Sequence, residues 1–167
     1  MGAGKTTVGR EVAKRLAWRF DDLDDLIQAA EGNTIEHIFQ QRGEKAFREI
    51  ERRILSATLA RNTSPRVLAL GGGAFVDAEN QALLESARVP AVFLDAPVEE
   101  LFERSEHPEI VRPLRRDRDH FCELYEQRRP VYLSAAICIQ TSGKDVGAVA
   151  EEIIAALNLL PNSGACE

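Results

Sequence analysis

The sequence predicts an α/β fold with a parallel sheet covered by helices on both faces. Short apolar or β-branched runs alternate with longer helical patterns along the chain, and such strands are typical of sheets buried on both sides. A glycine-rich turn that ends in Gly-Lys-Thr opens the chain and leads into the first helical pattern. With 167 residues, the chain has the length of one domain. We therefore expect a single domain over residues 1–160, followed by a disordered tail over residues 161–167.

Composition excludes several classes of protein. Hydrophobic residues make up 44% of the chain and charged residues 29%, which excludes a disordered or fibrous protein. The net charge of −6 argues against nucleic acid as a partner. No apolar run approaches the roughly 18 residues of a membrane span, so we expect no membrane partner. The three cysteines are odd in number and lack ligand spacing, which favours a reduced, cytoplasmic protein over a disulfide framework or a zinc site.

Each expected element has its own local signal. Val8, Val12 and Leu16 recur every four residues and predict a helix after Lys5. Asn33 and Glu36 form a capping pair that predicts the start of another helix. Apolar runs predict strands over residues 18–24, 67–70, 89–94 and 137–140. Further helical patterns cover residues 33–39, 44–60, 80–86, 98–105, 119–128 and 146–157.

Residues 2–7 form the second half of the phosphate-binding pattern G-x-x-x-x-G-K-[ST]. They are Gly2, Ala3, Gly4, Lys5, Thr6 and Thr7. Glycines let backbone N–H groups turn toward a phosphate, the lysine reaches the β- and γ-phosphates, and the first threonine hydroxyl holds Mg²⁺. The alternative is a glycine-rich turn before an ordinary helix. The amphipathic helix that follows and the acidic strand ends farther along favour the phosphate site.

The beginning of this pattern lies outside the chain. Its first glycine would lie two residues before Met1, and the strand that feeds the loop would precede that glycine. Such a strand is expected in the interior of the sheet, so its loss leaves unpaired ladder groups and an uncovered apolar slot. We therefore expect a fold whose N-terminal strand is missing, in a chain that begins at an internal methionine or is a fragment of a longer protein.

Two carboxylates close the expected strand over residues 18–24. Asp22 and Asp24 alternate with Leu23, so both project from the same side of an extended chain. Ligands bind beyond the carboxyl ends of parallel strands, which makes this pair a candidate for metal and acid–base chemistry. Asp21 and Asp25 leave the register open by one residue, and a solvated acidic turn is the alternative.

Two further clusters are candidates for a binding site. Arg48 and Glu51 lie three residues apart on one face of the expected helix over 44–60, where a surface ion pair is the ordinary interpretation. Gly71, Gly72 and Gly73 follow an apolar run. Three glycines in a row let the backbone approach a ligand and offer its N–H groups, whereas simple loop flexibility is the alternative.

Arginines gather in the last third of the chain. The segment at about 106–118 shows no helical period and contains Arg112, Arg115, Arg116 and Arg118. A charge run is usually a solvated face, yet a basic loop in an acidic chain suits a lid that closes over polyphosphate. Arg128 and Arg129 stand next to each other in R-R-P-V-Y, so the register again stays open by one residue.

Together these motifs resemble the shikimate kinase family. They are G-A-G-K-T-T-V-G-R, D-L-D-D-L-I, I-F-x-x-x-G-E-x-x-F-R-x-x-E, G-G-G-A, R-P-L and R-R-P-x-Y, in that family's order from Gly2 to about Leu157. Phosphate loops are widespread, whereas F-R-x-x-E with the triple glycine is much more specific. The resemblance implies a three-layer P-loop kinase fold. It also implies transfer of the ATP γ-phosphate to the 3-hydroxyl of shikimate, with Mg²⁺, on the route to aromatic amino acids.

The resemblance also implies roles for individual residues. Catalysis would fall to Lys5, to Asp24 as the base at the acceptor hydroxyl, and to Arg112, a lid arginine that stabilises charge on the transferring phosphoryl group. Thr6 and Asp22 would serve the metal. Shikimate would be held by Asp24, Arg48, Glu51, Gly71, Gly72, Gly73 and Arg128, with Arg48 and Arg128 on its carboxylate. The nucleotide would contact residues 2–7, Arg104, Arg112 and Lys144, although a plain surface turn is the alternative for Arg104 and the loop over 141–144.

Two other functions stay open at this point. One is a kinase-derived module that binds a carboxylated metabolite within a longer regulatory protein, which the missing strand keeps open. The other is a different small-molecule P-loop kinase, such as a gluconate kinase. Arg48 and Arg128 argue against that alternative, and a panel of substrates would decide between the two kinases. We expect the chain to act as a monomer.

Overall fold

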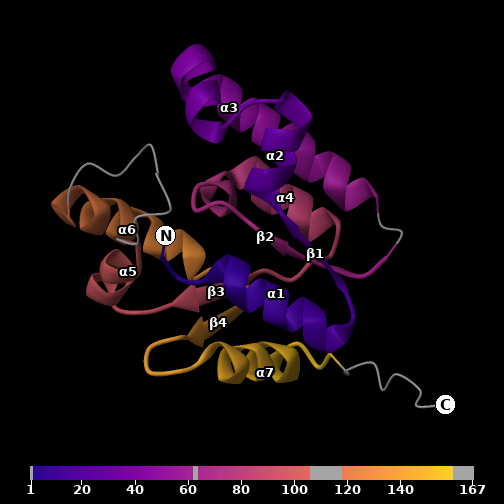
Figure 1. Cartoon of the computed structure of the whole chain (residues 1–167), viewed down its shortest axis with the longest axis vertical. Helices are drawn as coiled ribbons and strands as arrows, with labels where there is room; N and C mark the ends of the chain where they lie inside the picture. The colour runs from indigo at the N-terminus through magenta and orange to yellow at the C-terminus, as the bar shows by residue number, and fades with distance from the viewer. Residues whose placement is uncertain (1, 62–63, 106–117, 160–167) are drawn as a thin grey trace.

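The computed structural model describes residues 2–61, 64–105 and 118–159, and Figure 1 shows the arrangement of the elements. The strands are β1 (Arg19–Asp22), β2 (Arg66–Ala69), β3 (Val92–Asp95) and β4 (Ile137–Gln140). The helices are α1 (Lys5–Leu16), α2 (Leu23–Glu31), α3 (Ile35–Ala60), the 3₁₀ helix η1 (Ala74–Val76), α4 (Ala78–Ser86), α5 (Val98–Ser105), α6 (Arg118–Tyr132) and α7 (Val146–Ala156). The expected lid, up to residue 117, and the expected tail over 161–167 lie outside the described residues.

The four strands form two parallel pairs. β1 runs beside β2, with Arg19 opposite Arg66, and β3 runs beside β4, with Val92 opposite Ile137. No ladder joins β2 to β3 in the described part of the chain. The predicted α/β class with parallel strands is confirmed.

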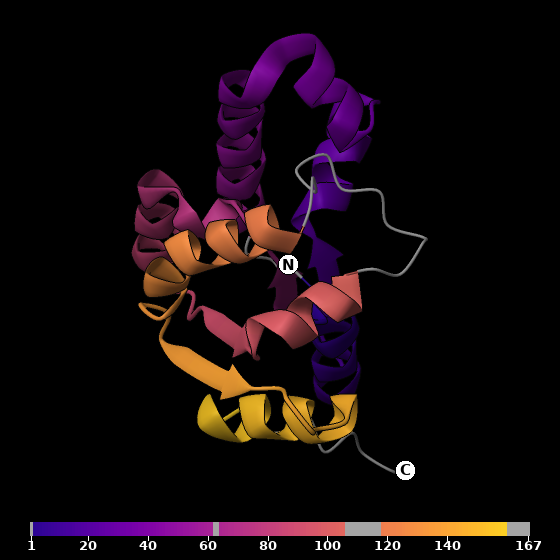
Figure 2. The ribbon, with the colours of Figure 1, turned by 90° about the vertical axis from the view of Figure 1, so that its left-hand side faces the viewer.

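The buried hydrophobic residues form two clusters. We call β1, α2, α3, β2, η1 and α4 the α2–α4 half, and α1, β3, α5, α6, β4 and α7 the α5–α7 half; Figures 1 and 2 show where these elements lie. The cluster of the α2–α4 half includes the fully buried Leu23, Ile27, Leu55 and Ala74. The cluster of the α5–α7 half includes Leu16, Leu101, Val149 and Ala150. α1 packs against β1 and β2 as well as against α7, so it connects the halves.

The chain becomes helical sooner after β1 than the sequence analysis expected. β1 ends at Asp22, and Asp24 lies in the first turn of α2, so the prediction of an extended chain through Asp24 was wrong. Asp22 caps α2, with its Oδ1 accepting the Asp24 N–H at 3.1 Å, and acidic residues are favourable at a helix start. Leu23 and Ile27 lie four residues apart and are both fully buried, which is a helical and not an alternating pattern.

The helices expected over 33–39 and 44–60 form one element, α3, that bends at Gly43. Gly43 has a φ of 76° and a ψ of 173°, a conformation that glycine adopts readily and other residues resist. The N-cap is Thr34, whose Oγ1 accepts the His37 N–H at 3.2 Å. The predicted cap at Asn33 was therefore wrong by one residue.

Two further differences between the expected and the observed elements lie at prolines. β3 begins at Val92 and not at Val89, because Pro90 offers no N–H to a ladder. α6 continues past Pro130 to Tyr132, four residues beyond the predicted end. Burial of Tyr132 explains this extension, since tertiary packing overrides local helix propensity.

Candidate active site

The loop before α1 has the backbone of a phosphate-binding turn. Gly4, the N-cap of α1, has a φ of 74°, and Gly2 has a φ of 65°, so both positions favour glycine. No side chain caps the first turn of α1, and an anion is well suited to the N–H groups and positive dipole of such a helix start. A Cβ on Gly2 would lie 2.1 Å from the Leu101 carbonyl oxygen. The loop therefore packs directly against α5.

Thr6 and Asp22 bring α1 and the end of β1 together. Thr6 Oγ1 donates a hydrogen bond to Asp22 Oδ2 at 2.9 Å. The described residues contain no group of three or more His, Cys, Asp or Glu side chains that could hold a metal ion by themselves. Mg²⁺, however, commonly takes only one or two protein oxygens and completes its shell with phosphate oxygens and water. The hydroxyl and carboxylate of this pair fit that requirement.

Asp24 faces the glycine loop that follows β2. A Cβ placed on Gly71 would lie 2.9 Å from Asp24 Oδ1. A glycine at position 71 therefore leaves room for the carboxylate. The start of α2 thus brings Asp24 to Gly71 even though the predicted extended geometry was wrong.

The four aspartates at positions 21, 22, 24 and 25 divide into two that face the site and two that do not. Asp21 is buried and bound elsewhere, since its carboxylate accepts hydrogen bonds from Arg19 Nε at 2.9 Å and Arg66 Nη1 at 3.3 Å. Asp25 is exposed. This arrangement favours Asp22 and Asp24 as the two site carboxylates.

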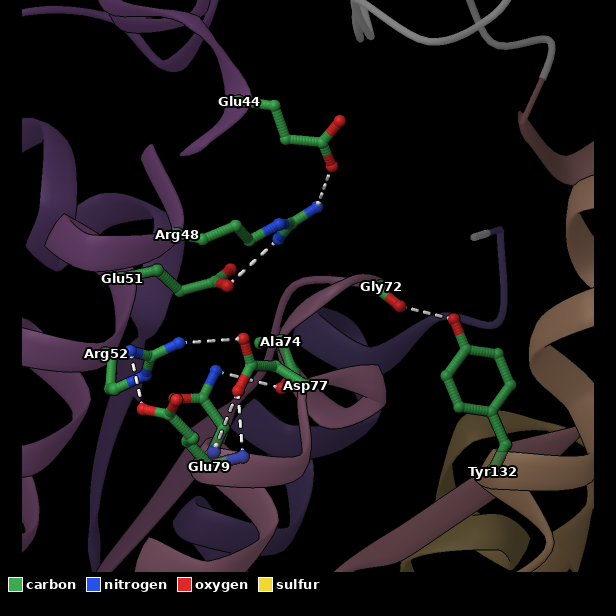
Figure 3. A network of polar contacts seen from close by, with 10 residues as sticks. Glu44, Arg48, Glu51, Arg52, Gly72, Ala74, Asp77, Glu79 and Tyr132 are labelled. Atoms are coloured by element: carbon green, nitrogen blue, oxygen red, sulfur yellow. Dashed lines mark hydrogen bonds and ion pairs between the residues drawn. The ribbon is translucent and has the colours of Figure 1, made fainter. Parts of the chain in front are cut away.

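Arg48 lies over the opposite part of the glycine loop (Figure 3). A Cβ on Gly73 would lie 2.5 Å from Arg48 Nη2, so only glycine permits this approach. Arg48 Nη1 donates to Glu51 Oε2 at 2.9 Å, and Nη2 donates to Glu44 Oε1 at 3.2 Å. Glu51 is only 1% exposed, so the pair is not an ordinary surface ion pair.

Burial and neighbouring charges together shift the pKa values of Arg48 and Glu51. Burial raises the pKa of Glu51, and the neighbouring Arg48 opposes that rise only in part. Burial would lower the pKa of Arg48, but Glu51 and Glu44 outweigh it and raise the pKa. Arg48 therefore keeps its positive charge at the edge of the loop.

Helix α6 holds the middle of the same loop. The hydroxyl of Tyr132 donates a hydrogen bond to the carbonyl oxygen of Gly72, as Figure 3 shows. Burial raises the pKa of Tyr132, and the positive charges of Arg128 and Arg48 work against this rise. Both arginines therefore act on the region beside Gly72, although they come from different helices.

The adjacent arginines of α6 have different surroundings. Arg129 Nη2 lies 2.7 Å from Asp95 Oδ2, whereas Arg128 lies one turn before Tyr132. Neighbouring residues on a helix point about 100° apart, so one arginine can face the loop while the other binds the end of β3. This geometry favours Arg128 over Arg129 for the site.

The sequence analysis did not single out Asp95 or Tyr132. Asp95 is 2% exposed and accepts hydrogen bonds from the Tyr125 hydroxyl, from Arg129 and from Gln140 Nε2 at 3.0 Å. Burial alone would raise the pKa of Asp95, but these hydrogen bonds outweigh it and lower the pKa. Asp95 ends an apolar strand, and the rule that ligands and polar groups gather at strand ends could have found it.

The candidate nucleotide-base residues are only partly brought together. Arg104 Nη1 donates to Thr141 Oγ1 at 3.1 Å, so α5 meets the loop that follows β4. Lys144 instead forms an ion pair with Glu152 of α7. Arg112 lies outside the described residues.

Comparison with known proteins gives one consistent result. The sequence model of the family described as shikimate kinase matches residues 1–158. A shikimate kinase from Streptomyces avermitilis is 43% identical over 95% of this chain and 92% of its own length. A shikimate kinase from Persephonella marina is 37% identical over 92% of both chains. The solved structure of a shikimate kinase from Acinetobacter baumannii in complex with shikimate has a TM-score of 0.84 and 34% identity, and covers 96% of this chain and 90% of that chain.

None of the helices that the structure describes is both long and apolar enough to span a bilayer.

Proposed function

We propose that this chain, which belongs to the shikimate kinase family, transfers the γ-phosphate of ATP to the 3-hydroxyl of shikimate. The observation that carries the proposal is the packing of Asp24 and Arg48 on the same glycine loop, against Gly71 and Gly73 respectively. A carboxylate that can accept a proton and a guanidinium that can hold an acid are thereby placed at the two ends of a three-residue loop. That spacing suits a small molecule with a hydroxyl at one end and a carboxylate at the other.

Arg48 and Arg128 bind the carboxylate of the acceptor in this proposal. The planar guanidinium of Arg48 suits bidentate contact with a carboxylate. Its Nη1 is held by the buried Glu51, while its Nη2 contacts Glu44, whose side chain is 62% exposed. The buried partner orients the guanidinium, and the exposed partner can be replaced by the substrate carboxylate. Arg128 approaches from α6 and supplies the second positive charge.

Asp24 orients the acceptor hydroxyl and takes its proton as the oxygen attacks the γ-phosphate. The proton passes to an Asp24 carboxylate oxygen, the new oxygen–phosphorus bond forms, and ADP leaves with the electrons of the broken bond. Lys5 and the N–H groups at the start of α1 hold the phosphates of ATP. The absence of side chains at residues 71–73 leaves room for the acceptor to approach the backbone of this loop.

Thr6 and Asp22 are the residues that would hold Mg²⁺. The cation supplies neutralisation of the phosphate charge when it is bound. Arg112, in the expected lid over residues 106–118, is proposed to add positive charge at the transferring group.

An ADP-release assay with the purified chain tests this function. We expect ADP release that requires both ATP and shikimate, with a phosphate ester of shikimate as the product by phosphorus NMR. Gluconate serves as the second acceptor, because a gluconate kinase would use it as well as or better than shikimate. Binding of shikimate without ADP release would instead support the binding module of a longer regulatory protein and overturn the proposal.

A further inference from the structure

Glu31 is the last residue of α2 and binds two arginines of α3. Its Oε1 lies 2.6 Å from Arg53 Nη2, and its Oε2 lies 2.7 Å from Arg42 Nη1. The Glu31 side chain is 11% exposed, whereas those of Arg53 and Arg42 are 62% and 48% exposed. An isolated ion pair at the surface contributes little, but here each oxygen of one largely buried carboxylate holds a guanidinium. The two contacts therefore fix one end of α2 to two separate points on α3.

A carboxylate is unfavourable at this place on α2. The C-terminal end of a helix carries a partial negative charge, and the last turn of α2 contains no basic residue. Gly32, with a φ of 64°, ends the helix directly after Glu31. The compensating positive charge comes from α3, so the contact with α3 accounts for a glutamate at this position.

The two arginines lie on different arms of α3. Arg42 comes directly before the bend of this helix, and Arg53 lies on the arm that follows the bend. The rings of Phe39 and Phe47, which belong to the same two arms, pack together with their centroids 4.4 Å apart. Since Glu31 holds both arms, it fixes the angle of the bend as well as the position of α2.

The same two helices carry the groups assigned to the acceptor. Asp24 lies in the first turn of α2, and Arg48 lies on the arm of α3 that carries Arg53. Burial raises the pKa of Glu51, and the charge of Asp24 raises it further, so the two carboxylates repel each other between α2 and α3. Attraction at Glu31 opposes this repulsion. The separation of Asp24 and Arg48 thus depends on ion pairs that include neither residue.

We propose that Glu31 is a positioning residue of the acceptor site, which sets the distance between Asp24 and Arg48 through its ion pairs with Arg42 and Arg53. The inference rests on the function proposed above, because it needs an acceptor that is held at both groups. A ligand that meets both groups gains affinity when their spacing is fixed before it binds. A ligand that meets only the guanidinium gains nothing from that spacing.

Titration of Glu31→Gln with two acids tests the proposal. Shikimate meets both ends of the site, whereas cyclohexene-1-carboxylate has the ring and the carboxylate without the hydroxyls. We expect the Kd of shikimate to rise about three- to tenfold, and the Kd of cyclohexene-1-carboxylate and of ATP to stay within about twofold. Arg42→Gln combined with Arg53→Gln should reproduce the rise, and adding Glu31→Gln to that pair should change the Kd of shikimate by less than about twofold. Calorimetry measures shikimate and ATP, and NMR titration measures the weaker acid.

Arg15→Gln is the matched control. Arg15 lies 2.7 Å from Glu11 and 2.7 Å from Glu151, so this variant also loses two ion pairs at one side chain, between α1 and α7. Its Kd for shikimate should equal that of the unchanged chain. Circular dichroism confirms that every variant is folded at the temperature of the titration.

Three results would overturn the role of Glu31. They are an unchanged Kd of shikimate in Glu31→Gln, an equal rise in Arg15→Gln, and an equal rise for both acids. The last result would show that the grip on the carboxylate, and not the spacing of the two groups, depends on Glu31.

Failure of the proposed function is visible in the unchanged chain. If that chain bound shikimate but released no ADP, the kinase function would fail, while the comparison of Kd values would still decide the role of Glu31. If it bound no shikimate, both proposals would be overturned.

Discussion

The α2–α4 half and the α5–α7 half use buried charge in opposite ways. In the α5–α7 half, Asp95 receives hydrogen bonds from Tyr125, Arg129 and Gln140, and these bonds lower its pKa against the effect of burial. In the α2–α4 half, Glu51 is bonded by Arg48, and burial still raises its pKa. The first carboxylate is satisfied inside the protein, whereas the second depends on one cation that also faces the glycine loop. A fully satisfied network fixes the helix α6, and a partly satisfied one keeps a guanidinium ready for a ligand.

The largest effect that separates the two halves is expected at Asp24. Asp24→Asn should lower kcat by about 10²–10⁴-fold, since it removes the proposed base, and should leave the ATP affinity within about twofold. The exposed neighbour supplies the matched control, so Asp25→Asn should keep nearly full activity. Steady-state kinetics and calorimetric titration with ATP measure both quantities. Unchanged turnover in Asp24→Asn would contradict the role given to this carboxylate.

The next effect tests the acid-binding part of the α2–α4 half. Arg48→Lys should raise the KM for shikimate by about 10–100-fold, because a point charge cannot reproduce bidentate contact with a carboxylate. The KM for ATP should stay the same. Arg52→Lys is the control on the same helix, because Arg52 pairs with Asp77 and Glu79. A similar rise in both variants would point to damage of α3 and not to loss of a substrate contact.

The α5–α7 half should lose stability and not chemistry when its buried carboxylate is changed. Asp95→Asn removes a charged acceptor from three donors and should lower the free energy of unfolding by about 1–3 kcal/mol. Urea denaturation followed by circular dichroism measures this change. We expect kcat to fall only a few-fold. A stability equal to that of the unchanged chain would show that Asp95 does not hold α6 on β3.

A smaller effect is expected where α6 meets the glycine loop. Tyr132→Phe removes the hydrogen bond to Gly72 and should cost about 1 kcal/mol of stability. The KM for shikimate should rise a few-fold, since the loop and Arg128 lose a common support. Tyr125→Phe is the comparison within the same helix, and it should reduce stability without a change in that KM.

The smallest effect is expected in the pH dependence of stability. The lowered pKa of Asp95 means that its contribution is present above the ordinary aspartate pKa of 3.8 and is lost as the pH falls through its folded value. The raised pKa of Glu51 means that its contribution is present below the ordinary glutamate pKa of 4.5 and is lost as the pH rises through its folded value.

In unfolding titrations at a series of pH values, the stability differences for the two carboxylates should therefore change with pH in opposite directions. The stability difference between the unchanged chain and Asp95→Asn should grow as the pH rises from about 2 to 5. The difference from Glu51→Gln should shrink as the pH rises from about 4 to 7. Slopes of the same sign would show that the pKa values of Asp95 and Glu51 are not shifted in opposite directions.

Local patterns were sufficient for the elements whose periodicity is uninterrupted. The sequence predicted α5 and β4 with the residues that the structure shows, because their apolar runs agree with their burial. It did not predict α2, since four aspartates in a row of five residues hide the spacing of Leu23 and Ile27. It also stopped α6 too soon, because only tertiary packing of Tyr132 keeps the helix going after Pro130.

The candidate site shows a similar limit. The motifs were sufficient to name Asp24, Arg48 and the glycine loop, which the structure brings together. They could not decide between Arg128 and Arg129, because the choice depends on where Asp95 lies relative to α6. That relation joins residues 34 positions apart and has no signal in local spacing. Lys144 shows the opposite case, since its sequence position suggests the nucleotide while its contact is with α7.

Asp22 has a consequence for how the two substrates affect each other. One of its oxygens accepts the Thr6 hydroxyl, and the other caps the helix that carries Asp24. A single carboxylate thus connects the phosphate side with the acceptor side. Any redistribution of its hydrogen bonds when one substrate binds must alter the position of the group that meets the other. We expect the two affinities to be interdependent, and thermodynamics requires the factor to be the same in both directions.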